Sequence, residues 1–167
     1  MTFATCTSTG ADARIVVLRQ ADANHKIVWF HTDARAGKVI QLEQFPNATL
    51  LFWDSKHQFQ LRLRVETHLH TDDLVADEHW QKLWAGGRKT YLSEKKPGSE
   101  QPEPYPGFPP RFGEALPSEA ESEAGRPNFS VVECQVLQLD YLRLGRAGQT
   151  RARFQYEPME TFTWLAP

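Results

Sequence analysis

The chain has 167 residues, of which 40% are hydrophobic, and this size fits a single domain over residues 1–167 with a sizeable core. Its formal net charge of −2 gives no sign of a surface built for a polyanion, so we expect no nucleic-acid partner. No apolar run approaches the ~20 residues that cross a bilayer, and Cys6 and Cys134 are isolated, so we expect a cytoplasmic protein with reduced thiols and no membrane contact.

Strand patterns dominate the first half of the chain. Two β-branched and aromatic runs, "ARIVVLR" at 13–19 and "HKIVWFHT" at 25–32, flank the turn-rich "QADAN" and predict a hairpin. The run "ATLLFW" at 48–53 predicts another strand. The strictest alternation of apolar and polar residues extends from Gln58 to His70. It predicts a long strand with one face that is wet or lined by a ligand.

A helix is predicted in the segment "DARAGKVIQLEQF", before the strand at 48–53. Asp33 is the candidate N-cap, Ala36 and Val39 fit helical spacing, and Pro46 forbids continuation. The first turn of such a helix has free N–H groups and the positive end of a dipole, and Lys38 lies beside it. A phosphate would fit there, although an ordinary capped helix with a solvated lysine is the commoner arrangement.

The second half holds one helix pattern, one proline-rich segment and a final group of strand patterns. The run "DEHWQKLW" predicts a helix in which Trp80 and Trp84 share a face, with Gly86 and Gly87 at its end. Ser93 to Asn128 holds eight of the eleven prolines, and we expect a partly ordered loop excursion over 93–128. Alternating runs predict the last strands, at 129–144, 150–157 and 160–165.

Motifs for other chemistries are absent or weak. The chain has no GxGxxG, GxxxxGK[ST] or GxSxG, so dinucleotide, P-loop and α/β-hydrolase functions have no support. His68 and His70 share a strand face, but ligands at suitable spacing do not complete the set, and we predict no metal. Arg62 and Arg64 on the long strand can bind an anion, although a solvated polar face is commoner.

Four segments, taken in order, resemble those of one family. They are "FATCTSTGADARIVVLR", "FHTDARAGK", "FPNATLLFWDSKHQFQLRLRVE" and "GQTRARFQYEPMETFTWLAP", and together they resemble the pyridoxamine 5′-phosphate oxidase-like family of FMN-binding split β-barrels. The resemblance implies a mainly β fold, an antiparallel split β-barrel with a few helices. It also implies bound FMN, a homodimer with FMN at the interface, and FMN-dependent oxidation or reduction of a small-molecule substrate. The alternative is a flavin-binding or ligand-binding protein without turnover.

The resemblance also assigns cofactor-binding residues. It implies that Arg14 and Lys38 contact the FMN phosphate, Thr32 the phosphate or ribityl chain, and Arg153 the FMN of the other subunit. Gln58 matches the glutamine that opens the family's long strand. Gln60 shares its strand face, and a two-residue slip exchanges the two. The other positions that the resemblance places beside the flavin are Ile15, Val16, Val17, Leu18, Arg19 and His31.

The substrate-binding positions depart from those of the true oxidases. Trp80 and Trp84 stand where the family has a tyrosine and an arginine, and Gln149 and Arg151 stand where it has an arginine and a histidine. We expect Arg19, Gln149 and Arg151 near the substrate, and poor activity on pyridoxamine phosphate. No catalytic side chain is assigned, because the redox chemistry belongs to the flavin.

Overall fold

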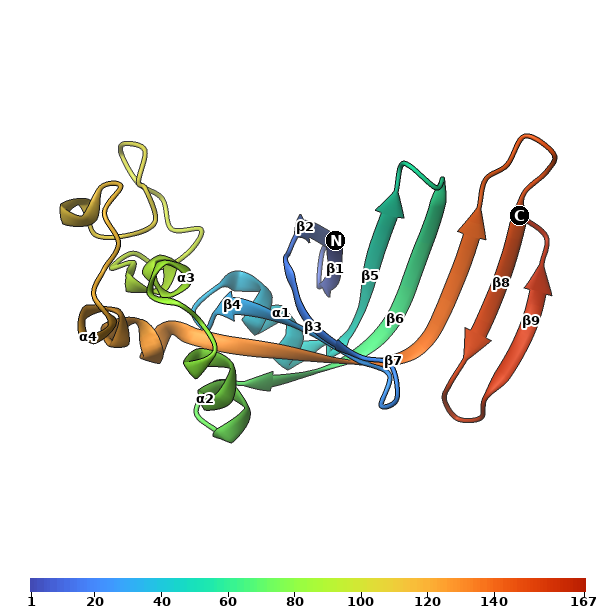
Figure 1. Ribbon diagram of the computed structural model, residues 1–167, viewed down its shortest axis with the longest axis horizontal. Coiled ribbons are helices and arrows are strands. Elements are labelled where there is room, and N and C mark those ends of the chain that lie inside the picture. The colour runs from blue at the N-terminus through green and yellow to red at the C-terminus, as the bar shows by residue number, and fades with distance from the viewer. The chain divides into compact units, whose positions relative to one another are not determined.

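The computed structural model describes all residues 1–167 and divides the chain into two compact units. Unit 1 comprises residues 1–30, 41–68 and 133–167, and unit 2 comprises residues 31–40 and 69–132. Unit 1 contains most of the β structure, and unit 2 contains most of the helical structure (Figure 1).

The chain forms nine strands and several short helices. In chain order these are β1 (Thr2–Thr7), β2 (Gly10–Ile15), β3 (Leu18–Asp22), β4 (Ile27–Asp33), α1 (Gly37–Gln44), β5 (Asn47–Asp54), β6 (Phe59–His70), α2 (Leu74–Gln81), α3 (Ala85–Arg88), η1 (Lys89–Leu92), η2 (Pro110–Phe112), α4 (Glu119–Ser122), η3 (Glu123–Asn128), β7 (Phe129–Arg143), β8 (Thr150–Gln155) and β9 (Thr161–Leu165). Strand pairs such as β1–β2, β5–β6 and β7–β8 are antiparallel. The predicted fold class, mainly antiparallel β with a few helices, is confirmed.

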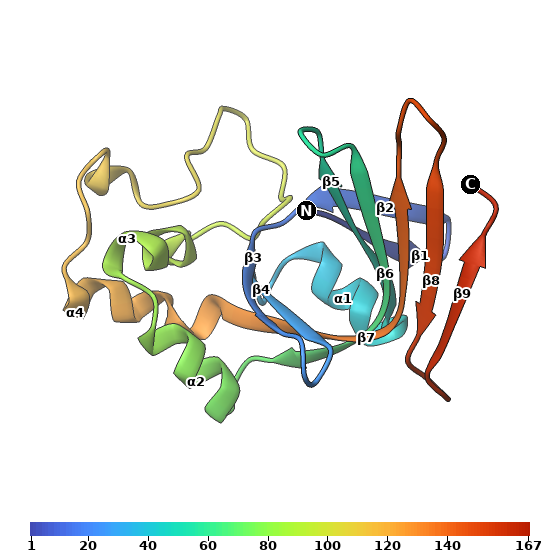
Figure 2. The same ribbon diagram turned by 45° about the vertical axis from the view of Figure 1, so that its right-hand side comes forward.

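The sheet curls so that the linked ends of its two outer strands, β2 and β3, come close. Its strand order is β2-β1-β5-β6-β7-β4-β3, with β8 and β9 continuing from β7, so β2 and β3 lie at opposite ends of this path. Only Val16 and Val17 separate these strands in the chain, and so short a link spans only about 11 Å. The C-terminal end of β2 therefore lies close to the N-terminal end of β3, as Figure 2 shows. Because no ladder joins β2 to β3, the barrel is split at this point.

Two of the predicted strands in this region need correction. The run 13–19 is not one strand, because β2 ends at Ile15 and β3 begins at Leu18. The chain leaves the ladder there, with the Val16 N–H donating to the Met1 carbonyl at 3.0 Å. Strand β1 was not predicted, since its alternate buried positions include a threonine, Thr5, which is 2% exposed. Period-two patterns are weak when polar residues occupy the buried face.

The β3–β4 hairpin is confirmed, with a shorter turn than predicted. Gln20 and Asp22 belong to β3, where they pair with Trp29 and Ile27. The Asp22 carboxylate accepts hydrogen bonds from the Asn24 and His25 N–H groups, at 2.8 and 3.0 Å. An aspartate that bonds to the backbone of its own turn favours a tight reversal.

The long strand is confirmed as β6, from Phe59 to His70. Leu63, Val65 and Thr67 are buried, while the alternate residues between them are exposed. Gln58 does not belong to the strand: its φ is +54°, and its amide donates to the Ser55 carbonyl at 2.7 Å. The predicted first residue of the strand is therefore part of the turn that precedes it.

The first predicted helix begins later than its N-cap prediction. Helix α1 starts at Gly37, whereas Asp33 caps a separate turn: it accepts the Arg35 N–H at 2.8 Å and forms an ion pair with the Arg35 guanidinium at 2.7 Å. The helix ends at Gln44, two residues before Pro46, as that proline requires. The Asp33 N-cap prediction was wrong because a short polar side chain serves a tight turn as well as a helix start.

The second predicted helix also differs from its pattern. Helix α2 ends at Gln81, and Trp84 stands in extended backbone at φ −72° and ψ 158°, so it no longer follows the helical spacing. Trp80 is 3% exposed and Trp84 is 66% exposed. The two tryptophans therefore do not share a face, and Gly86 and Gly87 lie inside α3 rather than ending α2.

An aromatic cluster forms the core of unit 2. Phe129 is fully buried, and its ring lies 4.9 Å from the ring of His31, 5.2 Å from Trp80 and 5.1 Å from Tyr91. The Trp80 N–H donates to Glu123 at 3.0 Å. Large buried aromatic rings carry much of the hydrophobic stabilisation of a small unit.

The proline-rich segment, residues 93–128, contains η2, α4 and η3 but no strand. Lys89, which is 9% exposed, binds the backbone of this segment. Its ammonium donates to the Gly113 and Ala115 carbonyls at 2.6 and 2.9 Å. The same ammonium lies 4.0 Å from the centre of the Phe108 ring, and Phe112 is 7% exposed. Burial of these groups offsets the cost of ordering a chain rich in proline and charge.

Asp73→Ala is expected to lower the free energy of unfolding by about 1 kcal/mol. Asp73 is the N-cap of α2, and its carboxylate accepts the Ala76 N–H at 3.0 Å. Urea denaturation of the two proteins measures the difference. Asp72→Ala is the control, since Asp72 is exposed and caps no helix; equal losses from both changes would show that the cap contributes nothing.

Candidate functional site

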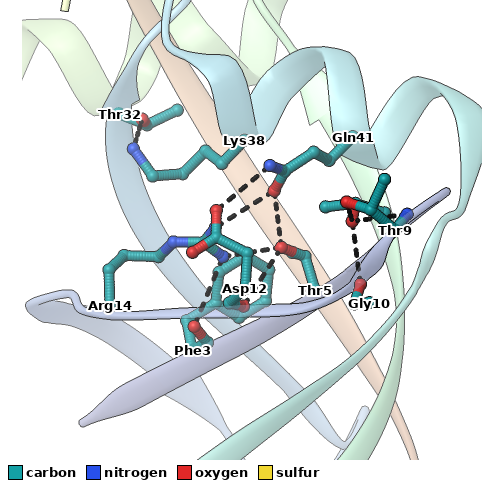
Figure 3. Close-up of polar contacts among 10 residues, drawn as sticks. Phe3, Thr5, Thr9, Gly10, Asp12, Arg14, Thr32, Lys38 and Gln41 are labelled. Carbon is teal, nitrogen blue, oxygen red and sulfur yellow. Dashed lines mark hydrogen bonds and ion pairs between the residues drawn. The ribbon is translucent and has the colours of Figure 1, made fainter. Parts of the chain in front are cut away.

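Arg14 stands at the centre of a polar cluster in unit 1 (Figure 3). Its guanidinium donates to the Thr5 hydroxyl at 2.7 Å and to the Gln41 side-chain oxygen at 3.0 Å, and it forms an ion pair with Asp12. The Gln41 amide also donates to the Asp12 carboxylate, at 3.1 Å. The cluster thus joins the β1–β2 hairpin to α1.

The register of the hairpin explains why these side chains meet. Arg14 pairs with Phe3, and Asp12 pairs with Thr5, so all four side chains lie on the same face of the two strands. The hydrogen bond from Gln41, together with the charge and hydrogen bond of Arg14, holds the pKa of Asp12 below its ordinary value despite some desolvation. Asp12 is therefore a carboxylate at neutral pH, and the guanidinium already holds an oxyanion.

A second pair of predicted residues meets in unit 2. Thr32, near the end of β4, is 5% exposed, and its hydroxyl accepts a hydrogen bond from the Lys38 ammonium at 2.9 Å (Figure 3). The turn between them holds Arg35, whose pKa is raised by its hydrogen bond to Asp33. Arg35 also donates to the Ser93 carbonyl at 3.0 Å. The guanidinium of this turn is thus paired with a carboxylate of the same turn.

The split between β2 and β3 exposes an aliphatic run directly after Arg14. Ile15 is 83% exposed, Val17 is 59% exposed and Leu18 is 41% exposed, whereas Val16 is buried. Successive exposed aliphatic side chains are unusual at the edges of a barrel, and they mark a surface that a ligand or a partner can cover.

Asp140 of β7 lies between two arginines of the neighbouring strands β6 and β8. It is 1% exposed and accepts two hydrogen bonds from Arg151, at 3.1 and 3.0 Å, and one from Arg62, at 3.0 Å. Burial alone would raise its pKa, but the Arg151 hydrogen bond and the charges of both arginines outweigh it, so the pKa lies below the ordinary value. Asp140 is ionised and bound on both sides.

Asp140→Asn is expected to flatten the acid limb of the stability curve. The pKa of Asp140 is lower in the folded state than the unfolded value near 3.9, so its stabilisation is present above that unfolded value and is lost as the pH falls through the folded pKa. Below about pH 4 the parent protein should therefore lose stability more steeply than the variant. Denaturant titrations across this range test it, with the exposed Asp72→Asn as control. An identical slope in Asp140→Asn and the parent would contradict the assignment.

The remaining predicted residues are His31, Gln58, Arg19, Gln149 and Arg153. His31 forms a 3.0 Å hydrogen bond with His79 and packs against Phe129. Gln58 occupies its turn, while Gln60 lies on β6 opposite Trp53, so only Gln60 is a strand residue. Three predicted contacts have exposed side chains: Arg19, Gln149 and Arg153.

Sequence reasoning missed Thr5, Asp12, Gln41 and Asp140. No signal in the sequence pointed to Asp140, because it alternates in phase with Gln138 while the apolar Leu137 and Leu139 lie on the other face of the strand. The others depend on a strand, β1, that the pattern did not reveal.

No group of three or more His, Cys, Asp or Glu side chains is arranged to hold a metal ion. None of the helices has the length and apolar character that a membrane span requires.

The antiparallel barrel, open between β2 and β3, places the chain in the class of split β-barrels. Residues 1–71, which include Arg14, Thr32 and Lys38, match the family model described as pyridoxamine 5′-phosphate oxidase, FMN-binding domain. The resemblance to the pyridoxamine 5′-phosphate oxidase-like FMN-binding family is therefore confirmed. No curated protein matches the chain by sequence.

Solved structures share this fold over nearly the whole chain. A pyridoxamine 5′-phosphate oxidase-related, FMN binding protein from Nostoc punctiforme PCC 73102 has a TM-score of 0.80 at 22% identity, covering 99% of this chain and 87% of that chain. PhzG from Burkholderia lata 383, solved in complex with tetrahydrophenazine-1-carboxylic acid, has a TM-score of 0.71 at 15% identity, covering 99% and 81%. A protein of the pyridoxinephosphate oxidase family from Clostridium acetobutylicum, related to general stress protein 26, has a TM-score of 0.59 at 15% identity, covering 93% and 84%.

Proposed function

We propose that this chain is an FMN-dependent oxidoreductase that acts as a homodimer with FMN at the interface. The observation that carries the proposal is the match of residues 1–71 to the FMN-binding family model, because that segment contains the cationic residues Arg14 and Lys38. When bound, FMN supplies two-electron redox chemistry, and the protein holds and orients the reactants.

The donor set suits a phosphate monoester. Such a group carries nearly two negative charges and needs several donors, and guanidinium and ammonium groups are the side chains that bind it best. Arg14 forms an ion pair with the Asp12 carboxylate. Two oxygen atoms of a phosphate resemble a carboxylate in negative charge and in the hydrogen-bond donors that they need. Lys38 is oriented by its hydrogen bond to Thr32. Each of these donors has the chemistry that FMN needs, and the family resemblance assigns Arg14, Thr32 and Lys38 as its phosphate and ribityl contacts.

The exposed aliphatic run supports the same proposal. A flavin ring is flat and largely apolar, so it needs an apolar surface beside the phosphate donors. Ile15, Val17 and Leu18 follow Arg14 directly in the chain, and their exposure leaves such a surface uncovered in a single chain. Arg19, at the end of the run, would then lie near the substrate.

Exposed aromatic side chains support the dimer. Phe162 and Trp164 of β9 are 50% and 66% exposed, and Trp53 of β5 is 52% exposed. Aromatic residues are enriched in protein interfaces. Arg153 pairs with Thr163 and therefore lies on the other face of the β8–β9 hairpin from Phe162 and Trp164, so its place at the partner's cofactor rests on the family resemblance.

The experiment begins with the purified protein. We expect a yellow dimer that releases FMN on denaturation, and sedimentation at micromolar concentration measures its mass. Anaerobic mixing with NAD(P)H, pyridoxine phosphate and pyridoxamine phosphate then tests whether any of them reduces the flavin. Failure to retain FMN after loading would overturn the proposal. Retention without reduction by any reductant would favour the second candidate, a flavin-binding protein without turnover, which the altered substrate-binding positions also allow.

A further inference from the structure

The arrangement around Asp140 holds more positive charge than a structural ion pair needs. One arginine neutralises one buried carboxylate, but Asp140 binds two, Arg62 and Arg151. The three groups carry a net charge of +1. The carboxylate is 1% exposed, whereas the side chains of Arg62 and Arg151 are 43% and 28% exposed. Solvent and solutes therefore meet the cations and not the anion.

The same face of the strands carries a further cation. Arg153 lies directly opposite Asp140 in the β7–β8 register, and directly opposed residues of an antiparallel pair share a face. Arg151 lies two residues before Arg153 and so shares this face as well. The exposed field around Asp140 is thus positive.

We propose that Arg62 and Arg151, held in place by Asp140, form a binding site for one oxyanion group, a carboxylate or a phosphate, of a small molecule. Each guanidinium has five N–H donors, and the three bonds to Asp140 leave further donors on both arginines. Asp140 fixes the two long side chains before a ligand arrives, so binding costs little side-chain entropy. The inference requires no flavin. If the proposed oxidoreductase function holds, this site predicts that the substrate carries an anionic group.

Isothermal titration calorimetry of the purified protein at constant ionic strength tests the site. The probes are benzoate, phenyl phosphate and the neutral benzamide. We expect at least one of the two anions to bind and benzamide not to bind. Arg62→Met and Arg151→Met should each weaken anion binding at least tenfold, and Arg151→Lys should recover part of the loss, because it restores charge without the bidentate geometry.

Arg143→Met is the matched control. Arg143 is an exposed arginine of the same strand, three residues from Asp140 and therefore on the opposite face of the ribbon. It should leave anion binding unchanged. Thermal melting establishes whether each variant is folded. If Arg151→Met does not fold, Arg151→Lys still tests the role of Arg151.

Tighter binding of phenyl phosphate would assign a phosphate ligand, and tighter binding of benzoate a carboxylate; either result supports the site. The proposal is overturned if neither anion binds at millimolar concentration, if benzamide binds equally well, or if the folded arginine variants bind like the parent. A protein that retains FMN but binds neither anion refutes this site alone. A protein that binds an anion but retains no flavin refutes the proposed function alone.

Discussion

Arg14→Ala is expected to weaken FMN binding about a hundredfold, because a guanidinium paired with a phosphate makes charge-assisted hydrogen bonds of about 1.5–3 kcal/mol each. Arg14 is suited to this role by position: it is held by Thr5 at 2.7 Å and by Gln41 at 3.0 Å, on the face of the β1–β2 hairpin that meets α1. Fluorescence titration of the apoprotein with FMN measures the affinity.

Two further variants separate a binding role for Arg14 from a structural one. Lys56→Ala removes a cation from an exposed turn and should leave the affinity unchanged. Asp12→Asn removes the carboxylate that now occupies the Arg14 guanidinium, so it should strengthen FMN binding severalfold. A weakened affinity in Asp12→Asn, equal to that of Arg14→Ala, would show that the cluster supports the hairpin rather than the cofactor.

Fully loaded holoprotein is expected to oxidise pyridoxamine phosphate poorly, with kcat/KM below roughly 10⁴ M⁻¹s⁻¹. The structure strengthens the reason for this expectation. Trp80 cannot contact a substrate, because it is 3% exposed and its N–H is bonded to Glu123. Gln149 carries no charge. A misplacement of the reacting carbon by ~1 Å can cost on the order of a hundredfold in rate.

Because Trp80 is buried, Trp84 is the altered family position at which a substitution can reach a substrate. Trp84 is 66% exposed and stands where the family has an arginine, so Trp84→Arg should raise the pyridoxamine phosphate activity. Leu116→Arg, at another apolar residue of unit 2 that is 56% exposed, is the control for added positive charge and should have no effect. Photoreduction of the same samples confirms a working flavin. A parent protein at or above the stated efficiency would refute the expectation.

Local patterns in the sequence were sufficient for most strands and for the resemblance to an FMN-binding family. The period-two alternation of β6 predicted its buried face, because side chains of a strand point alternately to its two faces and one face meets a core. The sequence also placed Lys38 in the first turn of a helix, and α1 begins at Gly37. The order of such short motifs was enough to show the resemblance to the FMN-binding family, whose model matches residues 1–71.

Other features depended on contacts that no local pattern contains. The run 13–19 has uniform strand propensity, yet it is divided because Val16 and Val17 must join the two edges of a closing barrel. The N-cap prediction for Asp33 and the shared face of Trp80 and Trp84 were wrong for a similar reason. Both predictions agree with the chemistry of the side chains. In the structure, however, Asp33 bonds within a separate turn and Trp84 lies in extended backbone after α2.

The candidate site shows the same division. The sequence singled out Arg14 and Lys38 because they match the family's phosphate-binding positions, and Arg151 because it stands where the family has a histidine. Their partners became visible only in three dimensions. Asp140 bonds to an arginine 78 positions away in the chain, and Thr5 bonds to Gln41 across 36. Such pairs form because strand register and sheet order bring distant segments together, and tertiary structure alone sets both.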